Sequence, residues 1–391
     1  MKDLLKQRIL ELEPELIALR RDIHENPELG TQEFRTSALV RNYLEGLGMA
    51  VQTVSGTGVV ALLQGHMPGK TLLLRADLDG LSQEEQNSVP YRSRRPGIMH
   101  ACGHDGHTAM LLIAAKVLTE RQAELKGCIK FVFQPNEEEA GALKMIQEGI
   151  LENPSVDGAV AVHLWTPIAS GRIGLAEGPV MAATEEFEIT VMGQSGHTST
   201  PHTAVDAVLA AAELVQALQR IQTREIDPLL PITIMVGSIH GGTGRNIIAD
   251  HVVLGGTIRF MFPDESLRKK ELLEKFERVI AGVCGSAGVT FTLKYIPSNP
   301  TLDNSPMMTA SLRRAAEMTF GTADNIEAYR CMAGEDFAEF SQRVPSALYF
   351  LGTGNSDADS LYPHHHPRFN IDEATLKWGV EMHVRAALDF L

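Results

Sequence analysis

The spacing of hydrophobic residues switches repeatedly between a helical and a strand-like period in the first part of the chain. Leucine and isoleucine recur at helical spacing from Leu4 to Leu19, and this helix is expected to stop at Pro27 and Gly30. Helices are also expected over 33–47, from about His104 onward and over 142–148, with strands over 58–63, 71–76, 128–134 and 159–165. Strands that alternate with helices predict βαβ units and a mostly parallel sheet.

The pattern changes near Ala183. Strand-like segments over 187–193, 232–239, 252–262 and 289–296 are separated by helical segments over 205–221 and 264–284. Phe187, Ile189 and Val191 fall on one face of the first of these strands. The β-α-β-β-α-β order predicts a small ferredoxin-like domain. We therefore expect an α/β fold in which one domain, residues 1–182 and 297–391, is interrupted by an inserted domain, residues 183–296.

The composition limits which binding partners and which cellular compartment are expected. Lys and Arg total 35 against 49 Asp and Glu, which gives a formal net charge of −14. This argues against a nucleic acid or an anionic membrane as the main partner, since both are met by a basic surface. Four cysteines are too few for a disulfide framework in 391 residues. With no signal-like N-terminal segment and no apolar run of about 20 residues, a cytoplasmic protein is expected.

The segment MHACGHDGHT, residues 99–108, is the densest chemical signal. It holds His100, Cys102, His104, Asp105 and His107. Thiolate, imidazole and carboxylate are ligands of first-row transition metals, so this segment favours a metal site. A Cys–His nucleophile pair and a structural turn are the alternatives.

Two acidic segments follow other expected strands. Asp77 and Asp79 end an apolar strand, and sites in open α/β sheets lie beyond the carboxyl ends of strands. A solvated Asp-Gly turn is equally compatible with this pair. Glu137, Glu138 and Glu139 follow the strand 128–134. They could form an acidic helix start, or give one metal ligand and one general base.

Histidines complete the pattern. His163 closes a strand of small apolar residues, and His364, His365 and His366 stand together near the C-terminus. Four separate segments thus bring metal-binding residue types to strand ends or loops of one α/β domain.

These motifs resemble the M20 metallopeptidase family, and specifically its amidohydrolase branch of hippurate hydrolases, N-acyl-amino-acid amidohydrolases and auxin-conjugate hydrolases. The segments RRDIHENPELG, LRADLDG, MHACGHDGHT, VFQPNEEE, GHTSTPH, GTIR, GEDF and HHPRF occur in the family's order along nearly the whole chain. The resemblance implies a di-metal catalytic domain and identifies the insert as a lid and dimerisation domain.

The resemblance also implies roles for individual residues. It makes Cys102 the ligand that bridges two divalent ions (Zn, Mn, Ni or Co). The other ligands would be His104, Glu138, His163 and His365, with Glu137 as general base and Asp77 and Asp79 in support. From the inserted domain, His197 would stabilise the oxyanion, often from the partner subunit, while Asn246 and Arg259 would hold substrate.

The expected function is metal-dependent hydrolysis of the amide bond of an N-acyl amino acid or related acyl conjugate. A dipeptidase of the same family, a thiol hydrolase using Cys102 and a binding module that lost its chemistry are the alternatives. The expected partners are a small N-acyl amino acid or peptide-like substrate and further copies of the chain, as a homodimer or higher homo-oligomer through the inserted domain. Nucleic acid and membrane are not expected.

Overall fold

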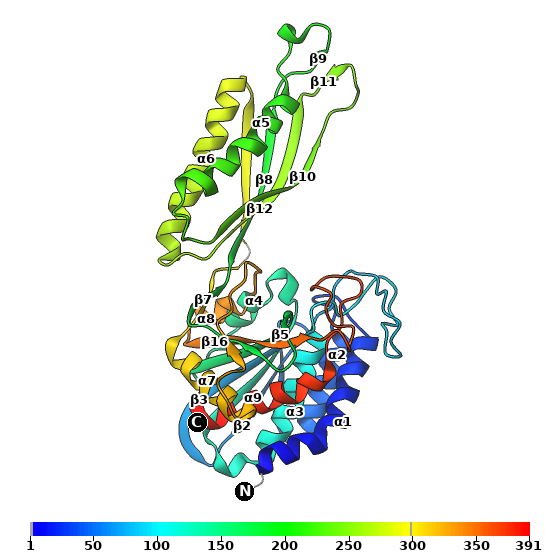
Figure 1. The fold of residues 1–391 in the computed structure, drawn as a ribbon, viewed down its shortest axis with the longest axis vertical. Helices are drawn as coiled ribbons and strands as arrows, with labels where there is room; N and C mark the ends of the chain where they lie inside the picture. Colours follow the sequence, from blue (N-terminus) through cyan, green and yellow to red (C-terminus); the bar gives the residue numbers. More distant parts are fainter. Residues whose placement is uncertain (1–2, 298) are drawn as a thin grey trace. The chain divides into compact units, whose positions relative to one another are not determined.

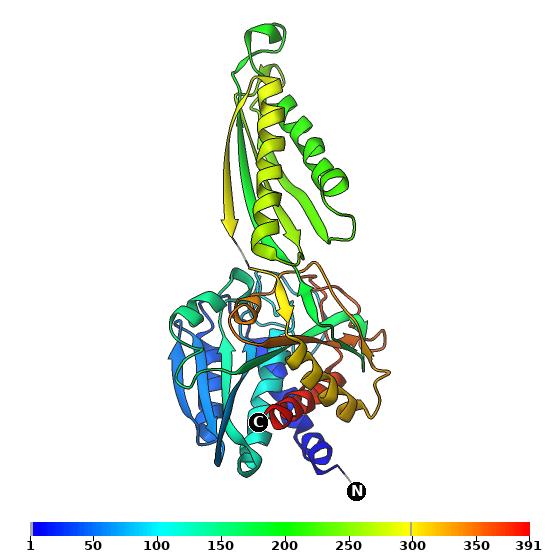
Figure 2. The ribbon, with the colours of Figure 1, turned by 90° about the vertical axis from the view of Figure 1, so that its left-hand side faces the viewer.

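The computed structural model describes residues 3–297 and 299–391. These residues form two compact units. The first comprises Met1–Val180, Leu302–Arg330 and Glu335–Leu391, of which residues 1 and 2 lie outside the described part. The second comprises Met181–Thr301 together with the short segment Cys331–Gly334. The two units are drawn in Figures 1 and 2 and are described separately below.

A mixed sheet organises the first unit. In its described residues the strand order is β1-β2-β4-β3-β5-β16-β6-β15. The central neighbours β4, β3, β5 and β16 run parallel, whereas β1, β2 and β6 pair antiparallel with their neighbours, apart from the short parallel β6–β15 pair. The strands are β1 (Ala50–Val54), β2 (Gly58–Gln64), β3 (Met67–Asp77), β4 (Lys126–Gln134), β5 (Gly158–Ala169), β6 (Ile173–Gly174), β15 (Ile326–Glu327) and β16 (Ser346–Gly354). The expected α/β fold with a mostly parallel sheet is confirmed.

Helices pack on this sheet according to their hydrophobic pattern. Helix α3 is apolar all round over Ala109–Ala115, and each of these side chains is fully buried. Such a helix must be covered on every side. It contacts α1 and α9 as well as strands β3, β4 and β5 (Figure 1). The helices of the unit are α1 (Leu4–Glu25), α2 (Phe34–Gly46), α3 (His104–Glu120), α4 (Ala142–Gln147), α7 (Pro306–Phe320), α8 (Ala338–Ser341) and α9 (Leu376–Phe390). A separate pair joins β7 (Gly178–Met181) to β14 (Leu302–Asn304).

The second unit is an antiparallel sheet, in the order β10-β12-β8-β13, that packs against two helices (Figure 2). Phe187, Ile189 and Val191 of β8 are buried, whereas Glu186 before them and Glu188 between the first two are exposed. The alternation expected for a strand with one buried face is therefore present. The elements are β8 (Ala183–Met192), α5 (Ala207–Arg220), β10 (Ile232–Gly241), β12 (His251–Phe260), α6 (Glu265–Ala287) and β13 (Thr290–Pro297), with β9 (Gly196–His197) and β11 (Ile247–Ile248) as a separate two-stranded ribbon. The β-α-β-β-α-β order is observed.

Because of His383 on α9, we expect the folded protein to lose stability in acid. The His383 side chain is fully buried, and neither ring nitrogen has a hydrogen-bond partner in the described part of the chain. Burial lowers the pKa of His383 to about 3, below the usual value of about 6.5. Protonation therefore favours the unfolded chain, and stability should fall as the pH drops from about 6.5 toward 3, by up to about 1.4 kcal/mol per pH unit.

The variant His383→Met should lose less thermal stability than the wild type between pH 7.5 and 5.0. Methionine fills an irregular core site without a titrating group. Scanning calorimetry of both metal-free proteins at the two pH values tests this, because the other buried histidines contribute equally to each. An identical pH dependence of the two melting temperatures would contradict the prediction.

Candidate metal centre

The candidate residues gather where adjacent strands end. Asp77 is the last residue of β3, and the turn Glu137–Glu139 follows β4, the neighbour of β3 in the sheet. His163 lies on β5, the neighbour on the other side. Parallel strands bring their carboxyl ends to one edge, and for this reason segments far apart in sequence meet here.

The loop before α3 supplies the thiol and one imidazole. Gly103 adopts φ +93°, a left-handed conformation that glycine accommodates, and it turns the chain into the helix. Cys102 and His104 on either side of it are both buried. The Cys102 Sγ lies 3.7 Å from the His163 Nε2. The loop thus aims a thiol and an imidazole at the same point.

Hydrogen bonds leave one nitrogen of His104 and of His163 available. The His104 Nδ1 lies 2.9 Å from the Asp79 carbonyl oxygen and 3.2 Å from its carboxylate, while the Nε2 is buried without a hydrogen-bond partner among the described residues. The His163 Nδ1 donates to the Leu164 carbonyl at 2.9 Å, so its Nε2 faces Cys102. Ligand histidines are usually oriented by a bond from the other ring nitrogen in this way.

His107 is held differently. Its Nδ1 donates to Asp77 at 2.7 Å and its Nε2 accepts the Leu164 N–H at 2.9 Å, so both nitrogens are engaged. Asp77 also accepts from Arg75 at 2.7 Å. Although burial acts to raise it, the pKa of Asp77 is held well below its usual value by His104, His107 and Arg75. Asp77 therefore serves as a buried anion that fixes its neighbours.

The three consecutive glutamates separate into two that face the centre and one that does not. They form a single 3₁₀ turn between Asn136 and Ala140, both in the left-handed region, at φ +57° and +60°. Glu137 and Glu138 each lie within 4.8 Å of the His104 ring nitrogen, whereas Glu139 is exposed. Burial, and next the carboxylates of Glu335 and Glu138, raise the pKa of Glu137 well above its usual value.

The three C-terminal histidines also separate. His364 donates through its Nε2 to the Leu164 carbonyl at 2.9 Å and stacks on Trp165. His366 stacks on Tyr362. His365 adopts φ +63°, and its Nε2 lies 3.3 Å from the Glu138 Oε1. Of the three, His365 is the one grouped with Cys102 and Glu138.

The donor atoms fit metal ions. Of the five groups of described residues whose ligand atoms lie within 4.8 Å of one another, two share one thiol: Cys102, His104 and His163 form the first, and Cys102, Glu138 and His365 the second. The His104 Nε2 is buried without a hydrogen-bond partner in the described part of the chain, and the buried Glu138 Oε1 makes no hydrogen bond there beside its ion-pair contact with His365. Buried polar atoms without partners are costly, and a cation would satisfy them. Sulfur, nitrogen and oxygen donors together suit transition metals.

The second unit holds the remaining three candidates in two places. His197 on β9 pairs with Ile247 of β11, and the Thr198 N–H donates to the Asn246 carbonyl, so His197 and Asn246 are neighbours on an exposed ribbon. Arg259 pairs with Thr184, near the other end of β12 and β8. At about 3.3 Å per residue, the strand from Thr184 to Met192, which leads to the ribbon, is about 26 Å long. The Arg259 Nη1 donates to the Met332 carbonyl at 3.2 Å.

A buried polar network behind the centre was not assigned a role from the sequence. Arg75 donates to Asp77, Glu335, Asp336 and Gln134, and all five side chains are at most 2% exposed. Glu335 and Asp336 belong to the segment GEDF of the family pattern, which by itself implies no function for them here. The available signal was an arginine inside an otherwise apolar strand, because a buried arginine requires anionic partners.

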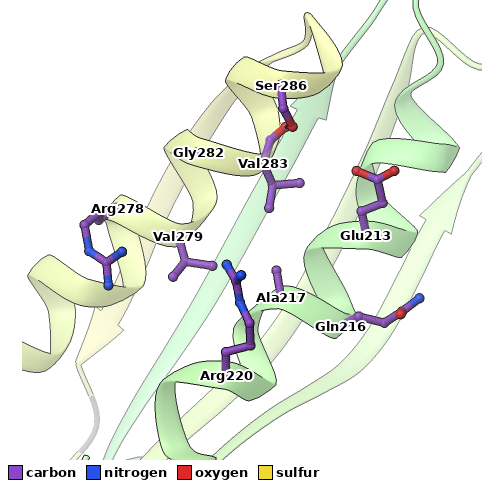
Figure 3. A pocket seen from close by; sticks show the side chains of 9 residues that line it. All are labelled: Glu213, Gln216, Ala217, Arg220, Arg278, Val279, Gly282, Val283 and Ser286. Atoms are coloured by element: carbon purple, nitrogen blue, oxygen red, sulfur yellow. Dashed lines mark hydrogen bonds between the residues drawn. The ribbon is translucent and has the colours of Figure 1, made fainter. Parts of the chain in front are cut away.

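A groove in the second unit lacks the cysteine and histidine side chains of the candidate metal centre. It lies between α5 and α6 and measures about 620 Å³. Figure 3 shows Arg220 and Arg278 on its facing helices and Glu213 along its wall. Arg278 pairs with Glu225. The groove has one carboxylate and neither cysteine nor histidine among its lining residues, so it offers no comparable set of metal ligands.

Comparison with known proteins identifies the family. Residues 73–389 match the model of Peptidase family M20/M25/M40. The chain belongs to this family. The family resemblance seen in the sequence is thereby confirmed, and the chain is a hydrolase of amide bonds.

Similar proteins cover nearly the whole chain. A putative amidohydrolase of Bacillus subtilis, YhaA, is 40% identical over 96% of this chain and 94% of its own. Thermostable carboxypeptidase 2 of Saccharolobus solfataricus is 37% identical over 99% and 98%. An N-acetyl-L-cysteine deacetylase of Bacillus subtilis is 38% identical over 93% and 85%. A solved Bacillus subtilis structure, described as a dinuclear metal-binding peptidase of the M20 family, is 31% identical with a TM-score of 0.84 over 97% and 98%.

No helix among the described residues is both long and apolar enough to cross a lipid bilayer.

Proposed function

We propose that the protein is a di-metal amidohydrolase that cleaves the amide bond of N-acyl amino acids or related acyl conjugates. One observation carries this proposal: two groups of metal-binding atoms share Cys102, and the carboxylate of Glu137 stands beside them. Metal-assisted hydrolysis needs a Lewis-acidic cation and a base for the proton of the water, and a metal pair beside a carboxylate would offer both.

Five residues would hold the ions. Cys102, His104 and His163 would bind one divalent ion, and Cys102, Glu138 and His365 the other. Bound there, the ions would supply Lewis acidity toward the substrate carbonyl and lower the pKa of the attacking water. Asp79 supports both groups, since it accepts from His104 and from the Glu138 N–H.

Glu137 would act as the general base. Its Oε2 lies 3.8 Å from the His104 Nε2, so it borders the ligand atoms, while Glu138, which is grouped with Cys102 and His365, would be the ligand. The carboxylate would take a proton from the attacking water and pass it to the leaving amine. A buried carboxylate among other acids is more basic than one in water, which suits this role.

The exposed ribbon of the second unit would complete the site. The imidazole of His197 would donate to the substrate oxygen as negative charge develops there. Asn246 and Arg259 would bind the substrate, and the guanidinium of Arg259 would match a carboxylate.

The substrate class is supported by the similarity to the deacetylase and can be tested directly. A panel of N-acyl amino acids and matched dipeptides should be incubated with the purified enzyme while its metal content is measured. Release of the free amino acid from the acyl substrates, with about two metal ions per chain, is expected.

A second candidate, a peptidase acting on dipeptides or C-terminal residues, is favoured by the similarity to the carboxypeptidase. Cleavage of the dipeptides alone would replace our proposal with this one.

We also propose that the active enzyme is a homodimer through the second unit. His197 and Asn246 lie near one end of β12, and Arg259 lies near the other, about 26 Å away. A single small substrate cannot reach both ends of one unit. Two copies of the chain could supply the two groups to one site.

Mixing two inactive variants tests this arrangement. Glu137→Gln lacks the base and His197→Ala lacks the oxyanion donor, so each variant should have low activity alone. Mixed dimers should recover activity, because the intact Glu137 of one protomer would work with His197 of the partner subunit. The rate after co-expression should exceed that of either variant alone. No recovery in dimers shown to be mixed would contradict a shared site.

A further inference from the structure

The turn that carries Glu137 and Glu138 is bordered by two residues in the left-handed backbone region, which alanine disfavours. Asn136 and Ala140 border it, and both have positive φ although neither is glycine. Gly141 follows, where a Cβ would lie 2.2 Å from the Pro135 carbonyl oxygen. Such a backbone persists only when its surroundings fix it. The turn has its own backbone bonds, such as the Gly141 N–H to the Asn136 carbonyl at 2.8 Å, and contacts from other parts of the chain, such as Glu33 and Asp79, add to them.

Asp336 contacts both flanks of the turn. Its carboxylate accepts from the Gln134 side chain at 2.8 and 2.7 Å on the β4 side. On the α4 side it accepts from the Ala142 N–H at 2.8 Å. The Asp336 N–H also lies 3.4 Å from the Glu137 Oε1. One residue thus joins the start of the turn, its end and the proposed base.

Arg75 keeps Asp336 in place. It donates to the Asp336 Oδ1 at 2.9 Å and to the Gln134 Oε1 at 3.0 Å. Asp336, Gln134 and Arg75 are each at most 2% exposed. Bonds to a buried carboxylate gain strength from the low polarity around them and from its charge.

We infer that Asp336 is a positioning residue, which holds the turn Glu137–Glu139 by its two flanks and thereby sets the place of the Glu137 carboxylate. This inference rests on the proposed role of Glu137 as the base. Asp336 contacts Glu137, whereas the Glu138 N–H is bonded to Asp79, so Asp336 should influence the rate through Glu137 and leave the metal ligand in place.

Hydrogen exchange of the metal-free protein tests the holding of the turn. In Asp336→Asn an amide nitrogen replaces one acceptor oxygen. The remaining oxygen should face the cationic Arg75 and Gln134, so the bond from the Ala142 N–H is lost. Backbone amides within residues 134–142 should exchange faster than in the wild type, and those of α9 should not. Unchanged exchange in 134–142 would overturn the inference, whatever the enzyme's activity.

Kinetics test the consequence for Glu137. In Asp336→Asn, kcat should fall by about 10- to 100-fold with KM and metal content unchanged, since a small displacement of a catalytic group is costly. The same substitution in a Glu137→Gln background should cause no further fall. An equal additional fall in that background would mean that Asp336 acts elsewhere and would overturn the inference.

Two further variants separate positioning from general stability. Glu381→Gln removes another buried carboxylate, which pairs with Arg385 on α9, and it should alter neither exchange in 134–142 nor kcat. If Asp336→Asn does not fold, Gln134→Met undergoes the same measurements, because it breaks the flank bond and retains the pair between Arg75 and Asp336. If Glu137→Gln keeps wild-type kcat, the proposed base is wrong, and the exchange result still decides whether Asp336 holds the turn.

Discussion

Replacing Glu137 by glutamine should lower kcat by about 10²- to 10⁴-fold, the range expected for loss of a general base. The amide keeps the size of the carboxylate but cannot accept a proton. Cys102, His104, Glu138, His163 and His365 remain in place, so the metal content should equal that of the wild type. Turnover of an N-acyl amino acid and elemental analysis of the same preparation provide the two measurements.

The neighbouring Glu139 provides a matched control. It lies in the same turn and is exposed to solvent. Glu139→Gln should retain wild-type kcat. If Glu137→Gln remained fully active, or if both substitutions had the same effect, the assignment of the base within the three glutamates would be wrong.

Replacing Cys102 by alanine should remove both bound metals and essentially all activity. Its thiol is the atom shared by the two groups of donors, so its loss affects both positions at once. Cys102→Asp should retain measurable metal and activity, since a carboxylate can also ligate two cations. Cys128→Ala is the control, because Cys128 is a buried free cysteine within β4 and outside both groups.

The same variants separate the metal mechanism from a thiol mechanism. A hydrolase with Cys102 as nucleophile would lose all activity in Cys102→Asp and would tolerate a chelator. Burial, and next the carboxylate of Glu138, raise the pKa of the Cys102 thiol, which disfavours a free reactive thiolate. We expect chelation to abolish activity and added Mn²⁺ or Zn²⁺ to restore it.

The fold was predictable from sequence because its signals are local. The period of Leu4–Leu19 and the apolar strands before Asp77 and Glu137 indicate helix and strand without reference to distant residues. The metal-binding segments were visible for a related reason: five candidate ligands fall between His100 and His107, and parallel strands must bring the other segments to the same edge. Those features depend on residue type and spacing alone.

Other features depend on contacts that sequence spacing does not encode. The network of Arg75 joins Gln134 to Asp336, which is 202 residues further along the chain. The family pattern places the motifs of Arg259 and His197 in one inserted domain, but it does not say how far apart the two residues lie. Their separation follows from the strand register in the structure. The choice of His365 over His364 and His366 rests on the family motif in the sequence. In the structure, ring nitrogen partners and a positive φ distinguish the three.

The segment Cys331–Gly334 belongs to the second unit, although the residues before and after it belong to the first. This has a consequence for the design of chimeric proteins. Ala333 accepts a hydrogen bond from the Ala182 N–H, and a Cβ at Gly334 would lie 2.8 Å from the Asn299 Oδ1. Glu335 and Asp336 follow directly. If residues 181–301 were replaced by those of a relative, the four original residues 331–334 would pack against residues of the relative. This mismatch would lie immediately before the acids that contact Arg75. A crossover design should exchange 331–334 together with 181–301 as one cassette.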